Sequence, residues 1–211
     1  MSGYWAEFGE VAAAHLLAVA VPGSDFAIVL KQSLAHGRRA AIWTAVGLGT
    51  SILLHVTYSL LGIGLLLKGS PVAFNLVKYA GAAYLAWIGV QALRAKPRNA
   101  EVTAAPDPRH VPTAGSAWVT GFLTNALNPK VTIFIVALFV TVISPTTPKW
   151  IQAGYGLWMS FATMAWFTVV ACVFTQARVR GAFLRNGHWI DRAMGIVFLA
   201  FAVSLGLASL R

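Results

Sequence analysis

The amino-acid sequence predicts an all-α integral membrane protein, whose six transmembrane helices form a 3+3 inverted repeat with a broken first helix in each half. Three observations lead to this prediction. Only 10% of the 211 residues are charged and 58% are hydrophobic, whereas a soluble domain carries about a quarter charged residues. Several apolar stretches reach the roughly 20 residues that a helix needs to cross a bilayer. Two of these stretches are interrupted by proline at matching places.

The composition also excludes several classes of protein. Neither a soluble enzyme nor a disordered chain combines so much apolar sequence with so few charges. A secreted disulfide scaffold needs paired cysteines, and Cys172 is the one cysteine in the chain. The net charge of +10 does not indicate a nucleic-acid partner, because the basic residues are spread between the apolar stretches and do not form one patch.

Six apolar stretches are candidate transmembrane spans, and in chain order they cover residues 11–30, 40–67, 71–93, 117–143, 150–175 and 193–210. The sequence between the third and fourth spans is polar and rich in proline, which is typical of a linker. We therefore expect a single membrane domain, 1–211, in which a cytoplasmic linker (95–115) joins a first three-helix repeat (1–94) to a second (116–211). Because each repeat has an odd number of spans, the second enters the membrane from the opposite face.

The basic residues predict the orientation of the chain, because Lys and Arg near span ends favour the cytoplasmic side. Ten of them fall in the first, third and fifth connections, namely Lys31, Arg38, Arg39, Arg94, Lys96, Arg98, Arg109, Arg178, Arg180 and Arg185. Three fall on the opposite side, namely Lys68, Lys149 and Arg211. The sequence thus predicts a multi-pass protein of the bacterial inner membrane, with both termini outside the cytoplasm.

The first span of each predicted repeat contains a proline interruption. It reads Val21-Pro22-Gly23-Ser24-Asp25 in the first half and Asn125-Ala126-Leu127-Asn128-Pro129-Lys130 in the second. Proline removes a backbone donor and clashes with the preceding turn, so a helix breaks or bends there. Bending for packing alone is the simpler interpretation of the two prolines. Their matching positions beside ionisable residues favour a substrate site, because non-helical backbone inside a bilayer has to face protein or a watery cavity.

A new helix is expected to begin after each interruption. Ser24 or Asp25 is predicted to cap the first of these helices, and Asn128 followed by Pro129 is typical of the cap and first position of the second. Two helix N-termini would then face the middle of the membrane from opposite sides. Such ends carry free N–H groups and partial positive charge, which suit an anion such as a carboxylate.

Asp25 is the acidic residue that the predicted spans place deep in the membrane, whereas Asp191 is assigned to a connection. A buried carboxylate is costly unless it is paired or protonated, so its presence indicates function. Lys130 is the nearest candidate partner, and the two are expected to pair when the site is empty. Together they would suit a zwitterion, with Asp25 on the α-ammonium and Lys130 on the α-carboxylate. Burial would also let Asp25 carry a proton in exchange. The structural alternatives are a capping aspartate and a lysine that extends to the interface.

Other polar residues in the spans carry weaker predictions. His55 joins the candidate site because its span lacks another titrating group, whereas the part played by His15 is left open. Lys78 is expected to extend to the outer interface. No metal site is expected, because one deep carboxylate and two scattered histidines do not form a ligand cluster. An enzyme is not expected either, because no pattern ties a histidine to Ser24 and Asp25 as a general base.

Several motifs together resemble the LysE/RhtB family of amino-acid exporters, and the resemblance runs over nearly the whole chain. The motifs are Pro22-Gly23-Ser24-Asp25-Phe26, the later Ser33, Gly37, Arg38, Gly47 and His55, the stretch Tyr79–Gly89 with Leu93-Arg94, and Gly121-Phe122, Asn125 and Asn128-Pro129-Lys130. Ser24 stands where the family often has a second proline, which should soften the first break. The resemblance implies export of an amino acid or a close derivative, coupled to the proton gradient, with no cofactor.

The leading hypothesis is therefore an exporter of neutral amino acids of the threonine or homoserine type, working by proton antiport. The preference for neutral substrates rests on the single deep carboxylate, because a second cationic group on the substrate would need another. The expected partners are the amino acid, protons and the lipid bilayer, and a homodimer is compatible with the small size of the chain. The alternatives are a basic amino-acid exporter, a small-cation or metal exporter of similar architecture, and a membrane scaffold without transport activity.

Overall fold

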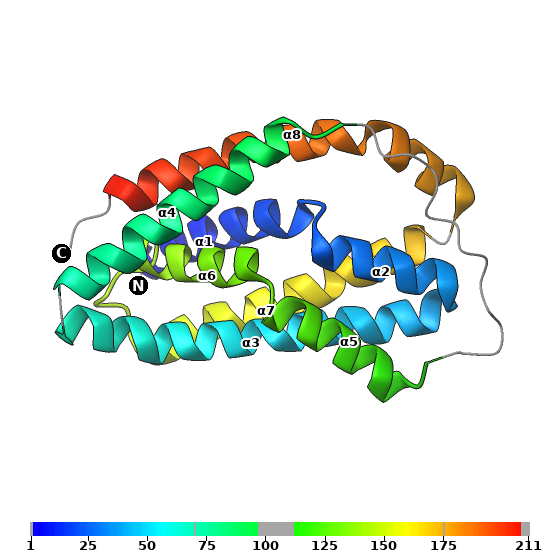
Figure 1. The fold of residues 1–211 in the computed structure, drawn as a ribbon. Helices are drawn as coiled ribbons and strands as arrows, with labels where there is room; N and C mark the ends of the chain where they lie inside the picture. The colour runs from blue at the N-terminus through cyan, green and yellow to red at the C-terminus, as the bar shows by residue number, and fades with distance from the viewer. Residues whose placement is uncertain (1, 70, 97–111, 175, 208–211) are drawn as a thin grey trace.

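The computed structural model describes residues 2–69, 71–96, 112–174 and 176–207. These ranges contain eight helices and no strand (Figure 1), which confirms the all-α prediction. In chain order the helices are α1 (Ser2–Ala20), α2 (Ser24–Ala35), α3 (Gly37–Gly69), α4 (Pro71–Leu93), α5 (Ala114–Ala126), α6 (Pro129–Thr141), α7 (Lys149–Val173) and α8 (Ala177–Leu207). Most of the predicted linker lies outside the described residues.

Both proline interruptions break their helices, as the sequence predicts. The axis turns by 54° between α1 and α2 and by 59° between α5 and α6. The bends follow from the missing backbone donor and the steric demand of Pro22 and Pro129. Each broken pair still has the length and apolar composition of one membrane span.

Several of the described helices are long and apolar enough to cross a membrane. By length and composition, α3 and α7 are each apolar enough to cross a membrane, and counting each bent pair as one span raises the number to four. Helix α8 already starts at Ala177, well before the last predicted span, 193–210. The arginines in the first turns of α8 hide this start from a search for apolar sequence, although charged side chains do not interrupt a helix.

Glycines let the helices cross closely at three places. A Cβ on Gly121 of α5 would collide with the Thr44 carbonyl of α3. A Cβ on Gly49 of α3 would lie 2.7 Å from the Ser160 carbonyl oxygen of α7, and one on Gly195 of α8 would lie 2.7 Å from the Gly89 carbonyl oxygen of α4. Small residues are what allow such close backbone contact between membrane helices.

These crossings arrange the helices around the broken segments. The α4–α8 pair lies on one side of the molecule and α3 and α7 on the other, with α1, α2 and α6 between them (Figure 1). The buried apolar residues form two clusters. One includes Val11, Ile135 and Phe198, and the other includes Val29 and Phe167.

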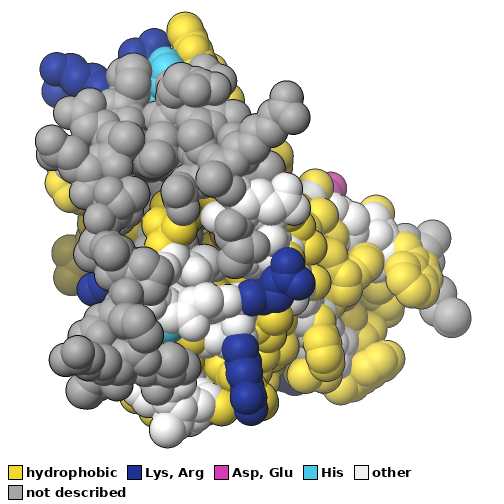
Figure 2. Space-filling view, turned by 90° about the vertical axis from the view of Figure 1, so that its right-hand side faces the viewer, with side chains coloured by type: hydrophobic (Ala, Val, Ile, Leu, Met, Phe, Trp, Pro, Cys, Tyr) yellow, Lys and Arg dark blue, Asp and Glu magenta, His cyan; other side chains and the backbone are white. Residues whose placement is uncertain are grey.

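One end of the molecule carries exposed basic side chains. Helix α1 begins and α8 ends at the same end (Figure 1). The opposite end, where α2 ends and α3 begins, shows Lys and Arg side chains in Figure 2, and Lys31, Arg38 and Arg39 are exposed.

Candidate functional site

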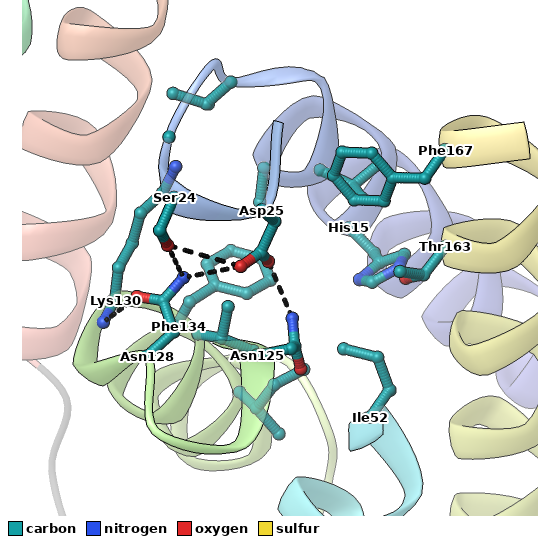
Figure 3. A pocket seen from close by; sticks show the side chains of 16 residues that line it. His15, Ser24, Asp25, Ile52, Asn125, Asn128, Lys130, Phe134, Thr163 and Phe167 are labelled. Carbon is teal, nitrogen blue, oxygen red and sulfur yellow. Dashed lines mark hydrogen bonds between the residues drawn. The ribbon is translucent and has the colours of Figure 1, made fainter. Parts of the chain in front are cut away.

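A cavity lies where the two interruptions meet (Figure 3). Its walls come from α1, both interruptions, α3, α6 and α7, and its polar lining side chains are His15, Ser24, Asp25, Asn125, Asn128, Lys130 and Thr163. The space open to the centre of a water molecule is about 40 Å³, which is room for about three waters.

Asp25 is held by side chains from the second interruption. Its Oδ2 accepts a hydrogen bond of 2.7 Å from Asn125 Nδ2, and its Oδ1 accepts one of 3.1 Å from Asn128 Nδ2. The neighbouring Ser24 hydroxyl donates to Oδ1 at 3.3 Å and accepts from Asn128 Nδ2 at 2.8 Å. Hydrogen bonds to an ionised carboxylate are stronger than those between neutral groups. The two breaks are therefore joined into one polar cluster by residues a hundred positions apart in sequence.

The two half-helices that start at the cavity begin differently. At the second interruption, Asn128 accepts a hydrogen bond of 3.1 Å from Lys130 N and Pro129 takes the first helical position, as predicted. At the first, the cap is Gly23 and it has no side-chain hydrogen bond. The prediction that Ser24 or Asp25 caps this helix is wrong, because both already belong to the first turn of α2 and the Asp25 oxygens bond to the other break. The N–H groups at the start of α2 are thus without a side-chain cap.

Lys130 crosses from the second interruption to the first. Its side chain leaves the start of α6 and its Nζ lies 3.4 Å from the point where a Cβ would stand on Gly23. The same Nζ lies 5.0 Å from the ring centroid of Phe198 in α8. The ammonium therefore lies beside the N-cap of α2.

The predicted direct pairing of Lys130 with Asp25 is not found. The Asp25 oxygens are already occupied by the two asparagine amides, which reach them from the same break. Lys130 and Asp25 nevertheless line the same cavity. A carboxylate and an ammonium thus share the cavity without being joined to each other, and a zwitterion would displace part of the amide hydrogen bonding of Asp25.

His55 contacts the second interruption from outside the cavity. It is fully buried in α3, and its Nε2 donates to the Asn125 carbonyl at 3.1 Å, while the Tyr58 hydroxyl contacts its Nδ1. Ser51 of the same helix donates to Asn125 Oδ1 at 2.8 Å. His55 itself does not line the cavity, and neither do Pro22 and Pro129. Their place in the structure is to hold the broken backbone and to orient Asn125.

Two residues lie elsewhere than the sequence predicts, and the structure places a third whose part the sequence leaves open. Asp191 is not in a connection, because α8 begins early and buries it to 6% exposure. Lys78 does not extend to the surface but is buried in α4, with Nζ 4.4 Å from the Tyr79 ring centroid. His15 lines the cavity together with Thr163 of α7. The first two corrections depend on helix packing, which local composition does not reveal.

The described cavity brings together side chains of opposite charge. It offers an anionic acceptor, a cation and amide donors, together with His15, two hydroxyl groups and apolar side chains. Among the described residues there is no cluster of three or more His, Cys, Asp or Glu side chains that could hold a metal ion. The groups present match the two charged ends of an α-amino acid.

Comparison with known proteins agrees with this geometry. Residues 16–209 match the model of the family described as LysE type translocator. The "Threonine efflux protein" of Escherichia coli (strain K12) is 32% identical over 202 residues, which cover 94% of this chain and 96% of that protein. The protein of the same name in Salmonella typhi is 28% identical over 198 residues, covering 94% of this chain and 96% of that protein.

A second kind of relative matches a shorter part of the chain. The "Homoserine/homoserine lactone efflux protein" of Salmonella typhimurium is 34% identical over 131 residues, which cover 62% of this chain and 62% of that protein. No solved structure matches the chain. The family model and the full-length relatives bear out the resemblance drawn from motifs along nearly the whole chain, and the chain belongs to the LysE type translocator family.

Proposed function

We propose that this chain exports small neutral amino acids from the bacterial cytoplasm in exchange for protons. The observation that carries the proposal is the cavity at the meeting point of two broken helices, which Asp25 and Lys130 both line without bonding to each other. The names of the relatives, which refer to efflux of threonine and of homoserine, support the substrate class.

Each end of the substrate has a partner in this proposal. The Asp25 carboxylate receives the α-ammonium, displacing part of its hydrogen bonding to Asn125 and Asn128. The Lys130 ammonium, together with the N–H groups that begin α2 without a side-chain cap, receives the α-carboxylate. A neutral side chain then faces the apolar remainder of the wall, formed in part by Ile52, Ile135 and Phe167.

Exchange with a proton follows from the single carboxylate. An ionised Asp25 binds the ammonium on the cytoplasmic side, and a proton that enters from the outside neutralises the carboxylate and releases the amino acid. The protonated carrier then returns, and Asp25 gives its proton to the cytoplasm. Each cycle moves one amino acid outward and one proton inward, so the proton gradient drives export.

The proposed architecture is a 3+3 inverted repeat with both termini outside the cytoplasm. Under this plan α1–α2, α3 and α4 are the first repeat, and α5–α6, α7 and α8 are the second. It is supported by the two broken pairs at corresponding places and by the close crossings that join α3 to α7 and α4 to α8, which occupy equivalent positions in the two halves. Alternating access would come from rocking of one repeat against the other around the central cavity.

The direct test is flux from reconstituted vesicles. Proteoliposomes are loaded with labelled threonine and diluted into acidic buffer, so that protons flow inward as threonine leaves. Efflux faster than in protein-free vesicles, and slowed when a protonophore collapses the gradient, is the expected result. Efflux that ignores the gradient would contradict proton exchange, and no efflux of threonine, homoserine or other neutral amino acids would contradict the function itself. Faster efflux of lysine than of threonine would favour the alternative of a basic amino-acid exporter.

A further inference from the structure

His15 lies in the wall of the cavity, and the proposed handling of the ammonium and carboxylate makes no use of it. It belongs to α1 and its side chain is 3% exposed. The ring packs edge-on against Trp158 with 5.9 Å between ring centroids. Figure 3 shows it between Asp25 and Thr163, on the side of the cavity away from Asn128 and Lys130.

The hydrogen bonds of the His15 ring determine which of its two nitrogens carries the hydrogen in the neutral form. His15 Nε2 lies 3.1 Å from the Met159 carbonyl oxygen and 3.0 Å from Thr163 Oγ1. A carbonyl oxygen can only accept, so the ring hydrogen of neutral His15 resides on Nε2 and points at α7. The other nitrogen, Nδ1, then presents a lone pair and acts as an acceptor.

This acceptor lacks a donor. His15 Nδ1 is buried and has no hydrogen-bond partner among the described residues. A buried polar atom without a partner is unfavourable, and in native proteins it frequently marks a functional position. The wall opposite the Asp25 cluster therefore favours a ligand group that can donate one hydrogen bond.

The surroundings decide which donor fits. The lining near His15 includes Val19, Ile52 and Phe167, and within the described cavity Asp25 is the one carboxylate. The proposed function already assigns Asp25 to the α-ammonium. A second ammonium on the substrate would be left with a neutral ring and apolar neighbours, which is costly. A hydroxyl group is a neutral donor and meets the acceptor without this cost.

We infer that His15 selects substrates with an aliphatic side-chain hydroxyl, which donates to Nδ1 while Thr163 and the Met159 carbonyl hold the ring in place. The inference rests on the proposed function and adds a specificity-determining residue to it. It predicts discrimination between side chains of equal shape that differ only in a hydroxyl. Binding sites built around a hydrogen bond reject analogues that lack the group far more strongly than apolar pockets reject a missing methyl group.

The test compares isosteric amino acids in the same proteoliposomes. Threonine is paired with valine, and homoserine with norvaline, because each pair exchanges a hydroxyl for a methyl group. For the wild-type protein we expect the hydroxylated member to be exported at least about tenfold faster at limiting concentration. Equal rates within both pairs would overturn the inference, as would lysine being exported as fast as threonine.

Two variants separate the roles of the ring nitrogens. The amide of His15→Gln can take the place of Nε2 and still donate to Met159, but it offers no acceptor at the Nδ1 position. The shorter amide of His15→Asn can take the place of Nδ1. We expect His15→Gln to export threonine and valine at similar rates, with valine efflux kept, and His15→Asn to retain part of the preference for threonine.

The outcomes distinguish this inference from the proposed function. A His15→Gln protein that reaches the membrane and keeps the wild-type ratio of threonine to valine would contradict a role for Nδ1. Wild-type protein that moves neither amino acid would contradict amino-acid export, and the inference would fall with it. If the variants do not insert into the membrane, equal export rates within both isosteric pairs of the wild-type protein would still overturn the inference.

Discussion

Asp25 illustrates how much of the site depends on single side chains. Its carboxylate is held by Asn125 and Asn128, and Asn125 is in turn held by Ser51 and by His55. The amide of Asn125 therefore has a fixed orientation, with its oxygen toward α3 and its nitrogen toward Asp25. Connected networks of this kind position a charged group more precisely than one contact could.

Replacing Asn125 by Leu removes the shortest hydrogen bond that Asp25 receives from an amide. A hydrogen bond to a charged group contributes about 1.5–3 kcal/mol, so we expect a measurable fall in thermal stability in detergent. We also expect at least about tenfold slower threonine efflux, which corresponds to about 1.4 kcal/mol, because the carboxylate loses its orientation.

Thr120→Val is the matched control for this change. Its hydroxyl donates to Ser116 O within α5, at 2.9 Å, and contacts neither the cavity nor Asp25. It should leave efflux unchanged. An Asn125→Leu protein with normal stability and normal efflux would show that the network does not position Asp25.

The sequence indicates the members of this cluster but not their contacts. Asp25, Asn125, Asn128 and Lys130 are recognisable because polar groups beside prolines are unusual within apolar spans. Which oxygen meets which amide depends on how two segments a hundred residues apart approach each other, and no local pattern encodes that. For the same reason the burial of Asp191 follows from packing of α8 and is missed by composition.

At the scale of helices, close backbone contact fixes where the breaks lie relative to α3. Gly121 of α5 and Gly47 of α3 lie at the crossing of these helices, where a Cβ on either would meet the backbone of the other. The crossing lies about one helical turn before Asn125. Its geometry therefore helps to determine whether the Asn125 amide reaches Asp25.

Gly121→Ala should separate α3 from α5. The added Cβ meets the Thr44 carbonyl, and backbone atoms cannot move aside as a side chain would, so we expect a loss of about 1–3 kcal/mol in stability. Thermal unfolding in detergent measures this loss. Gly154→Ala in α7 is the control, because nothing lies within 4 Å of its Cβ, and it should be neutral or slightly stabilising. Equal melting temperatures for the two variants would contradict the close crossing.

Helix boundaries were more predictable than helix contacts. Pro22 and Pro129 locate both breaks because the loss of a donor and the ring clash act locally. Asn128 was also recognisable as a cap for a local reason, since its side chain needs to reach only two residues ahead. The sequence does not indicate the early start of α8 at Ala177, because a search for apolar stretches finds helices that are apolar enough for a membrane and overlooks polar helical turns.

For the whole molecule, one end is marked by hydrogen bonds between helices and the other by exposed basic side chains. At the end where α1 begins, the Glu7 carboxylate accepts hydrogen bonds of 2.8 Å from Ser144 N and 2.9 Å from the Thr147 hydroxyl. These contacts join α1 to the connection between α6 and α7. The opposite end carries the exposed Lys31, Arg38 and Arg39. The proposed orientation makes the first end the outer one and the second the cytoplasmic one.

Thiol labelling of intact cells tests this orientation. In a Cys172→Ser background, Trp5→Cys lies at the proposed outer end and Lys96→Cys at the proposed cytoplasmic end, and both positions are exposed. A membrane-impermeant maleimide should label Trp5→Cys in intact cells and Lys96→Cys only after the cells are permeabilised. The reverse pattern would show that the chain is inserted the other way.

The most direct test of the account is proton movement evoked by threonine, compared between the wild-type protein and Asp25→Asn. Proteoliposomes containing a trapped pH dye report protons that enter as threonine leaves, and Glu10→Gln serves as a control because Glu10 is exposed and outside the cavity. The account predicts a threonine-dependent proton signal for the wild type and Glu10→Gln, and none for a folded Asp25→Asn protein. A threonine-dependent proton signal from Asp25→Asn as large as that of the wild-type protein would contradict the claim that Asp25 couples threonine export to proton entry.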